Sequence, residues 1–186
     1  EIIEEKVRGL GFEVEKFEIH DLKVCEKVAK YADQFYEKRK RKGVTREIAE
    51  KLMHRRPNYF GSMMVETGDA DALISGVTAF YPETIKPALE CIGVKDGTTR
   101  VAGMHILIRN GKVFFLADTS VNINPTADEL AHIAILAADT VKEFDIEPKV
   151  AMLSFSDFGS VQDEESKKMR RAAAMVNELR PDIICE

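Results

Sequence analysis

Apolar residues recur along the chain with two different spacings. In some stretches they stand three or four positions apart, as on one face of an α-helix, and elsewhere they form short runs typical of β-strands. The helical spacing predicts helices at 1–9, about 22–39, 46–55, 57–64, from 84 onward, 130–144 and 169–179. The short runs predict strands at 12–19, 72–74, 101–108, 113–118, 150–155 and 181–186. The repeated order of strand, small polar loop and helix is typical of an α/β fold.

The stretch from Ala70 to Leu89 is the most informative part of this pattern. Its short apolar run, 72–74, is expected to be a strand buried on both faces. Small and hydroxylated residues follow the run, namely Ser75, Gly76 and Thr78. Because proline fits the first turn of a helix, Pro87 predicts that Thr84 is the N-cap. Lys86 then lies near the second helical position.

A lysine at the start of a helix has two interpretations. A helix start, a small-residue loop and Lys86 together indicate a site for an anion such as phosphate. Alternatively, Lys86 is an ordinary surface residue. Loops of similar composition follow the predicted strands at 118–126 and 154–160. In the first of these, Asp118 either contacts a ligand or bonds to nearby backbone N–H groups. We expect the three loops to line one cleft.

Five consecutive basic residues, 38–42, precede Gly43 at the end of a predicted helix. Cations near a helix C-terminus complement the helix dipole, and glycine suits the position that follows the helix. Because this many charges exceed what a helix end needs, we favour a site for a polyanion. A nucleic-acid patch is the weaker alternative, since no aromatic residues are interleaved with the basic ones.

The second half of the chain carries clear local signals. Asn110-Gly111 between two apolar runs predicts the two-residue turn of a β-hairpin. Thr126 and Glu129 have the spacing of a capping box, which predicts a helix start. The glycine-, lysine- and threonine-containing segment 93–99 predicts a linker before the hairpin.

Composition and charge narrow the class of protein. The 186 residues, 45% hydrophobic and 32% charged, are enough for one large domain or two small ones. No apolar run is long enough to span a membrane, and the net charge of −5 argues against a dedicated nucleic-acid binder. Cys25, Cys91 and Cys185 fit neither a metal site nor a set of disulfides, so we expect a reducing, cytoplasmic environment. Since both ends fall within helix- or strand-like patterns, we expect a segment of a longer polypeptide.

Several motifs resemble the phosphate acetyltransferase (phosphotransacetylase) family. They are Tyr36–Thr45, Ser75-Gly76 with Thr84–Ala88, Phe115–Asp118, Val150–Ser156 with Gly159-Ser160, and Pro181–Ile183. Two segments, Ala117–Leu130 and Ser154–Ser160, are most similar to the C-terminal acetyltransferase-like domain of NADP-dependent malic enzymes. Stand-alone acetyltransferases carry a Thr-Lys pair where this chain has Asp157-Phe158.

The resemblance implies a fold and a set of binding residues. The fold is a two-subdomain, three-layer α/β sandwich of the isocitrate/isopropylmalate dehydrogenase-like type, with a cleft between subdomains at 1–97 and 98–186. Phosphate or another anion is expected at Arg39, Lys42 and Lys86. Lys86 stands where the family has an arginine, and it offers one point charge in place of a bidentate fork. The residues expected to contact acyl-CoA or line the cleft are Ser75, Gly76, Thr78, Thr84, Asp118, Ser154, Ser156, Gly159 and Ser160.

The resemblance also implies a function. We expect a regulatory and oligomerising module of a NADP-dependent malic enzyme that binds acetyl-CoA or CoA. NADP and a divalent metal are expected only on a malic enzyme domain outside this chain. The family's catalytic residues are expected beyond Glu186, so this segment alone is expected to be inactive and to hold no metal. The alternative is an active phosphate acetyltransferase, which converts acetyl phosphate and CoA to acetyl-CoA and phosphate. The expected partners are these small molecules and further copies of the chain, without nucleic acid or membrane.

Overall fold

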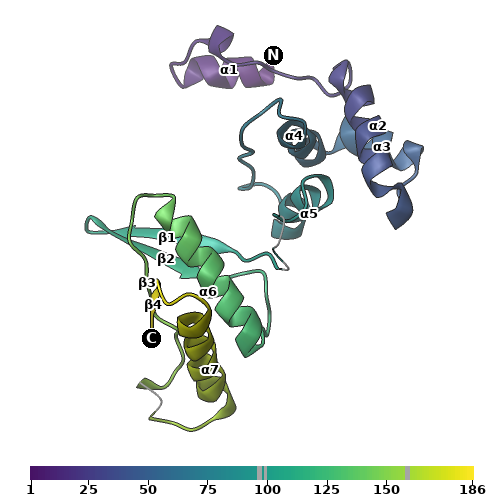
Figure 1. Ribbon diagram of the computed structural model, residues 1–186. Coiled ribbons are helices and arrows are strands. Elements are labelled where there is room, and N and C mark those ends of the chain that lie inside the picture. The colour runs from purple at the N-terminus through teal and green to yellow at the C-terminus, as the bar shows by residue number, and fades with distance from the viewer. Residues whose placement is uncertain (96–97, 99, 158–159) are drawn as a thin grey trace. The chain divides into compact units, whose positions relative to one another are not determined.

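The computed structural model describes residues 1–95, 98, 100–157 and 160–186. Within it the chain forms two compact units, unit 1 at Glu1–Gly93 and unit 2 at Val94–Glu186 (Figure 1). The predicted linker at 93–99 lies partly outside the described residues. Among the helices of the described ranges, none is long and apolar enough to cross a membrane.

Unit 1 consists of helices joined by turns and loops. Its elements are α1 (Ile2–Gly9), the 3₁₀-helix η1 (Val14–Lys16), α2 (Lys27–Arg39), the 3₁₀-helix η2 (Lys40–Lys42), α3 (Arg46–Arg55), α4 (Pro57–Glu66) and α5 (Tyr81–Cys91). The helical patterns at the start of the chain, at 46–55 and after Pro57 are confirmed.

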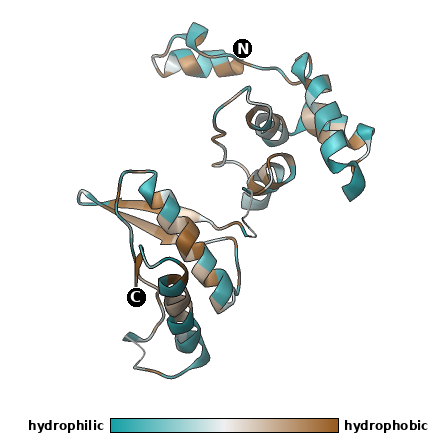
Figure 2. Cartoon of the chain, viewed as in Figure 1, coloured by the Kyte–Doolittle hydropathy of each residue, from teal (hydrophilic) through white to brown (hydrophobic). Residues whose placement is uncertain are grey.

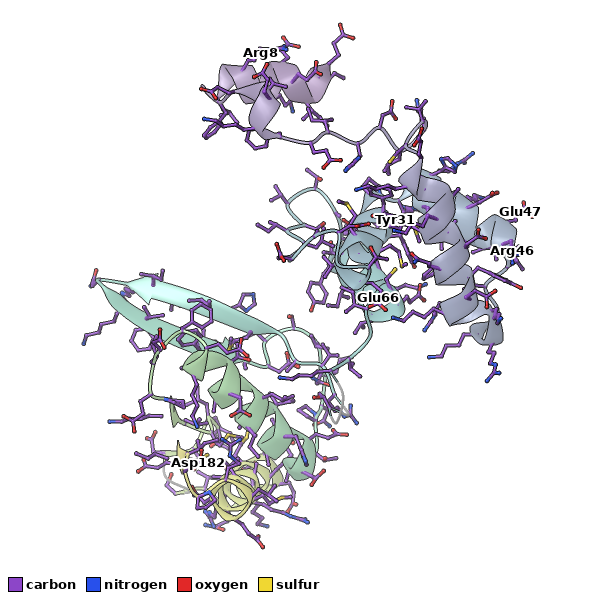
Figure 3. The ribbon with its side chains drawn as sticks, turned by 45° about the horizontal axis from the view of Figure 1, so that its top comes forward. Arg8, Tyr31, Arg46, Glu47, Glu66 and Asp182 are labelled. Carbon is purple, nitrogen blue, oxygen red and sulfur yellow. The ribbon has the colours of Figure 1, made fainter. Side chains whose placement is uncertain are left out.

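The core of unit 1 lies among α2, α3 and α4. Tyr31 and Phe35 of α2, Met53 of α3 and Met63 of α4 are all at most 1% exposed, and Tyr31 extends from α2 into this core (Figure 3). The rings of Phe35 and Tyr59 meet edge to face, with centroids 5.5 Å apart. Each helix buries one apolar face in this core, which is why the three-and-four spacing located these helices.

Side-chain and glycine signals set the ends of two helices as the sequence predicts. The Thr45 hydroxyl accepts a hydrogen bond from the Ile48 N–H at 3.2 Å and caps α3. Gly43 follows η2 with φ +88°, a conformation that glycine adopts without strain. The preceding helix is shorter than predicted, because α2 begins at Lys27 and not near Leu22. The backbone N–H groups of Val24 and Cys25 bond instead to the Asp21 carbonyl in a turn.

Two strands predicted for unit 1 are wrong. Residues 12–19 form a segment around η1, and residues 72–74 are without regular structure, with the Ile74 side chain 98% exposed. A strand needs a neighbour to pair its backbone N–H and C=O groups. Among the described residues of unit 1, no strand lies beside either segment. The short apolar runs therefore identified hydrophobic segments here, but they did not predict whether those segments pair with a neighbouring strand.

The start of α5 also differs from the prediction. The helix begins at Tyr81 after the N-cap Phe80, so Thr84 is not the N-cap and Lys86 lies well inside the helix. Pro82 occupies the first turn, where a missing N–H leaves no bond unmade. Pro87 is inside the helix and is tolerated there by a side-chain contact described below.

Unit 2 contains the predicted hairpin. Its strands β1 (Met104–Arg109) and β2 (Lys112–Ala117) pair antiparallel, with Arg109 opposite Lys112. Asn110 and Gly111 form the turn with φ of +51° and +73°, as expected for this dipeptide. Figure 2 shows apolar residues on both strands and on α6. The Phe115 and Phe144 rings lie 5.5 Å apart, which packs the hairpin against the segment that follows α6.

Two helices and a short parallel strand pair complete unit 2. The elements are α6 (Ala127–Lys142), β3 (Lys149–Val150), α7 (Glu164–Leu179) and β4 (Ile184–Cys185). The capping box of Thr126 and Glu129 is confirmed. Small alanines let α6 pack near α7 and the strand pair, and the buried cluster is Ala131, Ala134, Ala138, Val176, Ile183 and Cys185.

The strands predicted at 150–155 and 181–186 are present but shorter. Pairing extends beyond the strand limits only to Met152, whose N–H donates to the Glu186 carbonyl at 2.6 Å. Residues 153–155 have no neighbouring strand among the described residues, so this part of the apolar run forms no β-sheet hydrogen bonds.

Candidate functional site

A cavity of about 570 Å³ in unit 1 gathers several of the predicted site residues. The end of α3, the first turns of α4 and α5, and the loop after residue 74 form its wall. Ser75, Gly76, Thr78 and Lys86 line it, and anion binding by these residues stays a prediction. The positive ends of two helix dipoles lie at this wall, because α4 and α5 both begin there.

Positive charge dominates the cavity. Arg55, Arg56 and Lys86 line it, and Glu83 is the one carboxylate among the described residues of its lining. The Arg56 guanidinium lies 3.7 Å from the Glu83 carboxylate, and both side chains are more than half exposed. The Arg55 side chain forms no hydrogen bond or ion pair within the described part of the chain. A ligand with negative charge is therefore favoured at this wall.

Asn58 joins three parts of the cavity wall. Pro87 has no N–H to offer the Glu83 carbonyl one helical turn earlier. The Asn58 side-chain N–H donates to that carbonyl at 3.1 Å and replaces the missing backbone bond. The Asn58 side-chain oxygen accepts a hydrogen bond from the Ser75 hydroxyl at 2.6 Å. One amide thus links the start of α4, the first turn of α5 and the Ser75 loop.

Arg39 does not line this cavity, although a carboxylate connects it to the same helix as Lys86. Glu90 accepts a hydrogen bond from Arg39 Nη2 at 3.4 Å through Oε1, and one from the Tyr59 hydroxyl at 2.5 Å through Oε2. The Lys86 Nζ lies 4.0 Å from Glu90 Oε1. Burial, together with the bond to Glu90, raises the pKa of Tyr59. Glu90 therefore occupies the position of an anion between the two predicted phosphate ligands.

The rest of the basic run is partly paired within unit 1. Lys38 forms an ion pair with Glu66, near the end of α4 (Figure 3), and Lys40 forms one with Glu37. Within the described residues, no ion pair involves Lys42, which is exposed in η2. Pairing to glutamates gives Lys38, Arg39 and Lys40 a structural role, and anion binding by Lys42 stays a prediction.

Thr84 and Ser75 share a second, smaller cavity of about 270 Å³. Its other lining residues are mostly apolar, with Val65, Leu73 and Ile85 among them. The Thr84 hydroxyl is buried without a hydrogen-bond partner within the described chain. Thr84 therefore lies beside the cationic cavity and not in it.

Unit 2 has a cavity of about 600 Å³ that runs along α7, from Ser166 to Asn177, and lies beside β4. Ser154 and Ser156 line it, together with Asp157 and Arg170. The Ser160 hydroxyl lies 3.3 Å from the Ser156 hydroxyl. Gly159 lies outside the described residues. The hydroxyl-rich loop thus borders a cavity in unit 2, and the expectation that the three loops line one cleft stays a prediction.

Asp118 bonds to its own surroundings in unit 2. Its Oδ1 accepts hydrogen bonds from the N–H groups of Gly103, Ser120 and Val121. Its Oδ2 accepts from the backbone and side-chain N–H groups of Asn122. Burial raises the pKa of the Asp118 carboxyl, but the bonds from Gly103 and Asn122 outweigh burial and hold this pKa below its usual value of 3.8. These contacts favour the backbone-bonding alternative for Asp118.

The Asp118 contacts predict an acid-sensitive loop. Because the pKa is lowered in the folded state, the stabilisation is present above pH 3.8 and is lost as the pH falls through the lowered pKa. In Asp118→Asn, which replaces an acceptor with a donor, the backbone amides of residues 120–122 are expected to exchange about tenfold faster at neutral pH. Hydrogen exchange measured against pH tests this, with the exposed Asp128→Asn on α6 as the control. Equal exchange in wild type and Asp118→Asn at neutral pH would contradict it.

Three cavity residues escaped the sequence reasoning. Arg55, Arg56 and Asn58 surround Pro57 at the start of α4, and all three line the cationic cavity. Proline at the first helical position marks a helix start, so the two arginines before it could have been placed at a positive helix end. Asn58 carried no such signal, since its role depends on Pro87 in another helix.

Unit 1 of this α/β chain thus has a cation-lined cavity at the starts of two helices. Residues 1–186 match the family model described as phosphate acetyl/butaryl transferase, so the chain belongs to that family. The resemblance of the motifs is thereby confirmed.

Known relatives come from two kinds of enzyme. The NADP-dependent malic enzyme of Escherichia coli K12 is 36% identical over 188 residues, which cover 100% of this chain and 25% of the relative. The phosphate acetyltransferase of Clostridium acetobutylicum is 39% identical and covers 97% of this chain and 56% of the relative. The chain therefore spans about a quarter of the malic enzymes it matches, and between about a quarter and about half of the phosphate acetyltransferases.

Solved structures show the same fold. A phosphotransacetylase from Streptococcus pyogenes superimposes with a TM-score of 0.85 at 37% identity, over 97% of this chain and 55% of that one. The EutD phosphotransacetylase from Staphylococcus aureus gives a TM-score of 0.83 at 30% identity, over 99% and 56%. The chain thus has the α/β fold of phosphotransacetylases.

Proposed function

We propose that this chain is the phosphotransacetylase-family part of a NADP-dependent malic enzyme and binds acetyl-CoA as a regulatory and oligomerising module. The cationic cavity of unit 1 carries this proposal. Arg55, Arg56 and Lys86 together with two helix starts suit the phosphate groups of such a ligand. The three-layer sandwich expected from the resemblance, the association of copies, and NADP and metal on another domain stay predictions.

Lys86 favours the regulatory role over catalysis. Its side chain is 66% exposed, and among the described residues its one charged partner is Glu90, at 4.0 Å. A mobile ammonium attracts an anion but orients it less than a bidentate guanidinium. Acyl transfer depends on orientation, whereas binding alone does not. The alternative proposal, an active phosphate acetyltransferase, draws its support from the similar identity of relatives such as the Clostridium enzyme.

Removal of the Lys86 charge tests the site. In the full-length protein, Lys86→Gln is expected to weaken acetyl-CoA binding about tenfold, because it removes a charged partner of the ligand phosphate. Isothermal titration calorimetry measures this, and the exposed Lys51→Gln on α3, outside the cavity, is the matched control. Unchanged affinity in Lys86→Gln, or an equal loss in Lys51→Gln, would count against the site.

A second assay separates the two functions. The regulatory proposal predicts that full-length protein consumes acetyl phosphate in the presence of CoA no faster than a protein-free blank. It also predicts that acetyl-CoA changes malate oxidation. Steady turnover of acetyl phosphate that Lys86→Gln reduces would establish the alternative.

A further inference from the structure

A thiol, an imidazole and a carboxylate lie together in the segment that precedes α2. The Cys25 Sγ is 3.8 Å from His20 Nδ1, and His20 Nε2 is 3.3 Å from Glu18 Oε1. The Cys25 side chain is half-buried, whereas Glu18 is 74% exposed. A nucleophile beside a base, with a third group beside that base, is the arrangement that activates a thiol.

Local structure brings Cys25 back to His20. The backbone N–H groups of Val24 and Cys25 both donate to the Asp21 carbonyl, which folds this segment into a turn. The His20 ring packs against the Phe60 ring of α4, with the two centroids 5.6 Å apart. Because the His20 side chain is only 19% exposed, the turn and this packing limit the orientations that the imidazole can adopt.

The carboxylate of Glu18 sets the tautomer of His20. A negative oxygen beside Nε2 favours a proton on that nitrogen, which leaves the lone pair on Nδ1. The Cys25 thiol then donates to Nδ1, and the imidazole takes up the proton when the thiolate forms. Cys25 also directly precedes Glu26, the N-cap of α2, and the positive end of this helix dipole favours a thiolate.

The other two cysteines have different surroundings. Cys91 is 0% exposed, and its thiol donates to the Tyr59 carbonyl at 3.9 Å. Burial raises the pKa of Cys91 to about 12, and burial also raises the pKa of Cys185. Within the described part of the chain, neither of these thiols bonds to a histidine. Cys25 is therefore the cysteine whose surroundings favour reaction.

We propose that Cys25 is a modification site, a reactive thiol that forms a mixed disulfide with a small-molecule disulfide. His20 takes the thiol proton, and the Cys25 thiolate attacks one sulfur of the reagent. The S–S bond of the reagent breaks as the new S–S bond forms, and the departing half leaves as a thiolate that takes the proton from His20. Cys25 is oxidised and the departing half is reduced, so the reaction needs no further oxidant. Because Cys25 packs against the core of unit 1, its modification would couple thiol oxidation to the packing of that core.

Oxidised glutathione, in excess over the full-length protein, is the probe for this site. Peptide mass spectrometry follows the glutathione adduct at each cysteine separately, and dithiothreitol is expected to remove the adduct. Cys25 is expected to react at least about tenfold faster than Cys91 or Cys185, because their thiols are buried and lack a base.

Removal of the imidazole tests its role as the base. His20→Gln is expected to slow the reaction of Cys25 about tenfold. A merely structural role of His20 predicts the opposite, since loss of local order exposes a half-buried thiol and speeds its reaction. His54→Gln is the matched control, because His54 Nδ1 bonds to the Leu22 carbonyl of the same segment at 2.7 Å. This control is expected not to slow the reaction of Cys25.

Three results would overturn the inference: a Cys25 that reacts no faster than Cys91, a His20→Gln variant that reacts as fast as wild type, or equal slowing in His54→Gln. If His20→Gln makes Cys91 reactive, the core has opened, and Glu18→Gln, a change in an exposed side chain, takes its place. Glu18→Gln is expected to slow Cys25 about threefold, because it removes the charge beside the imidazole. An unchanged rate in that variant would likewise overturn the inference.

Discussion

Phe35→Ala is expected to lower the free energy of unfolding of unit 1 by about 3–5 kcal/mol, the range found when a buried phenylalanine is truncated. The Phe35 side chain is 0% exposed, and its ring meets the Tyr59 ring edge to face. Alanine leaves a cavity among α2, α3 and α4 that these helices cannot close without losing other contacts. Hydrogen exchange of α2 and α4 amides in the full-length protein reports this loss for unit 1.

Val24→Ala is the matched control for the core variant. Val24 precedes α2 and is 78% exposed, so its truncation is expected to change stability by no more than about 0.5 kcal/mol. Similar amide exchange in Phe35→Ala and Val24→Ala would mean that the α2–α4 core does not limit the stability of unit 1.

Glu90→Ala is expected to cost about 2–3 kcal/mol, the second largest effect. Arg39 and Glu90 are only 18% and 21% exposed, and the substitution leaves the Arg39 guanidinium and the Tyr59 hydroxyl without their shared acceptor. Glu90→Gln keeps an acceptor of the same shape and is expected to retain part of this stability. Denaturant unfolding followed by a probe in unit 1 measures both variants.

A double-mutant cycle gives the control for this network. If Glu90 acts through Arg39, then Glu90→Ala is expected to cost less in an Arg39→Leu background, since no buried charge is left unpaired. Additive costs would show that the two side chains contribute independently and would leave Arg39 available as an anion ligand.

Local signals in the sequence were sufficient to predict those features whose hydrogen bonds join residues close together in the chain. Thr45, the Thr126–Glu129 capping box and the Asn110-Gly111 turn each satisfy backbone groups within a few residues, and all three are confirmed. The strand predicted at 72–74 failed because pairing needs a partner that a local pattern cannot reveal. Pro87 led to the wrong N-cap for a similar reason. Proline inside a helix is rare unless a distant donor replaces the missing N–H, and the sequence pattern did not reveal that donor.

The residues of the candidate site also differ in whether local sequence signals could locate them. Ser75, Gly76, Thr78 and Lys86 are near in sequence, and the structure brings them to one cavity. Arg39 belongs to the Glu90 network and Asp118 to its own loop, which only the contacts of other elements could show. Asn58 is the clearest case, because its two hydrogen bonds join segments that sequence spacing does not relate.

Because Asn58 donates a hydrogen bond to the Glu83 carbonyl, the residues tolerated at position 58 depend on the residue at position 87. A chain with alanine at 87 regains the helical N–H, and position 58 then no longer serves α5. A chain that keeps the proline needs a donor at 58. Single substitutions of Asn58 would therefore attribute the whole loss of stability to that residue. Libraries that vary positions 58 and 87 together would reveal the epistasis between them.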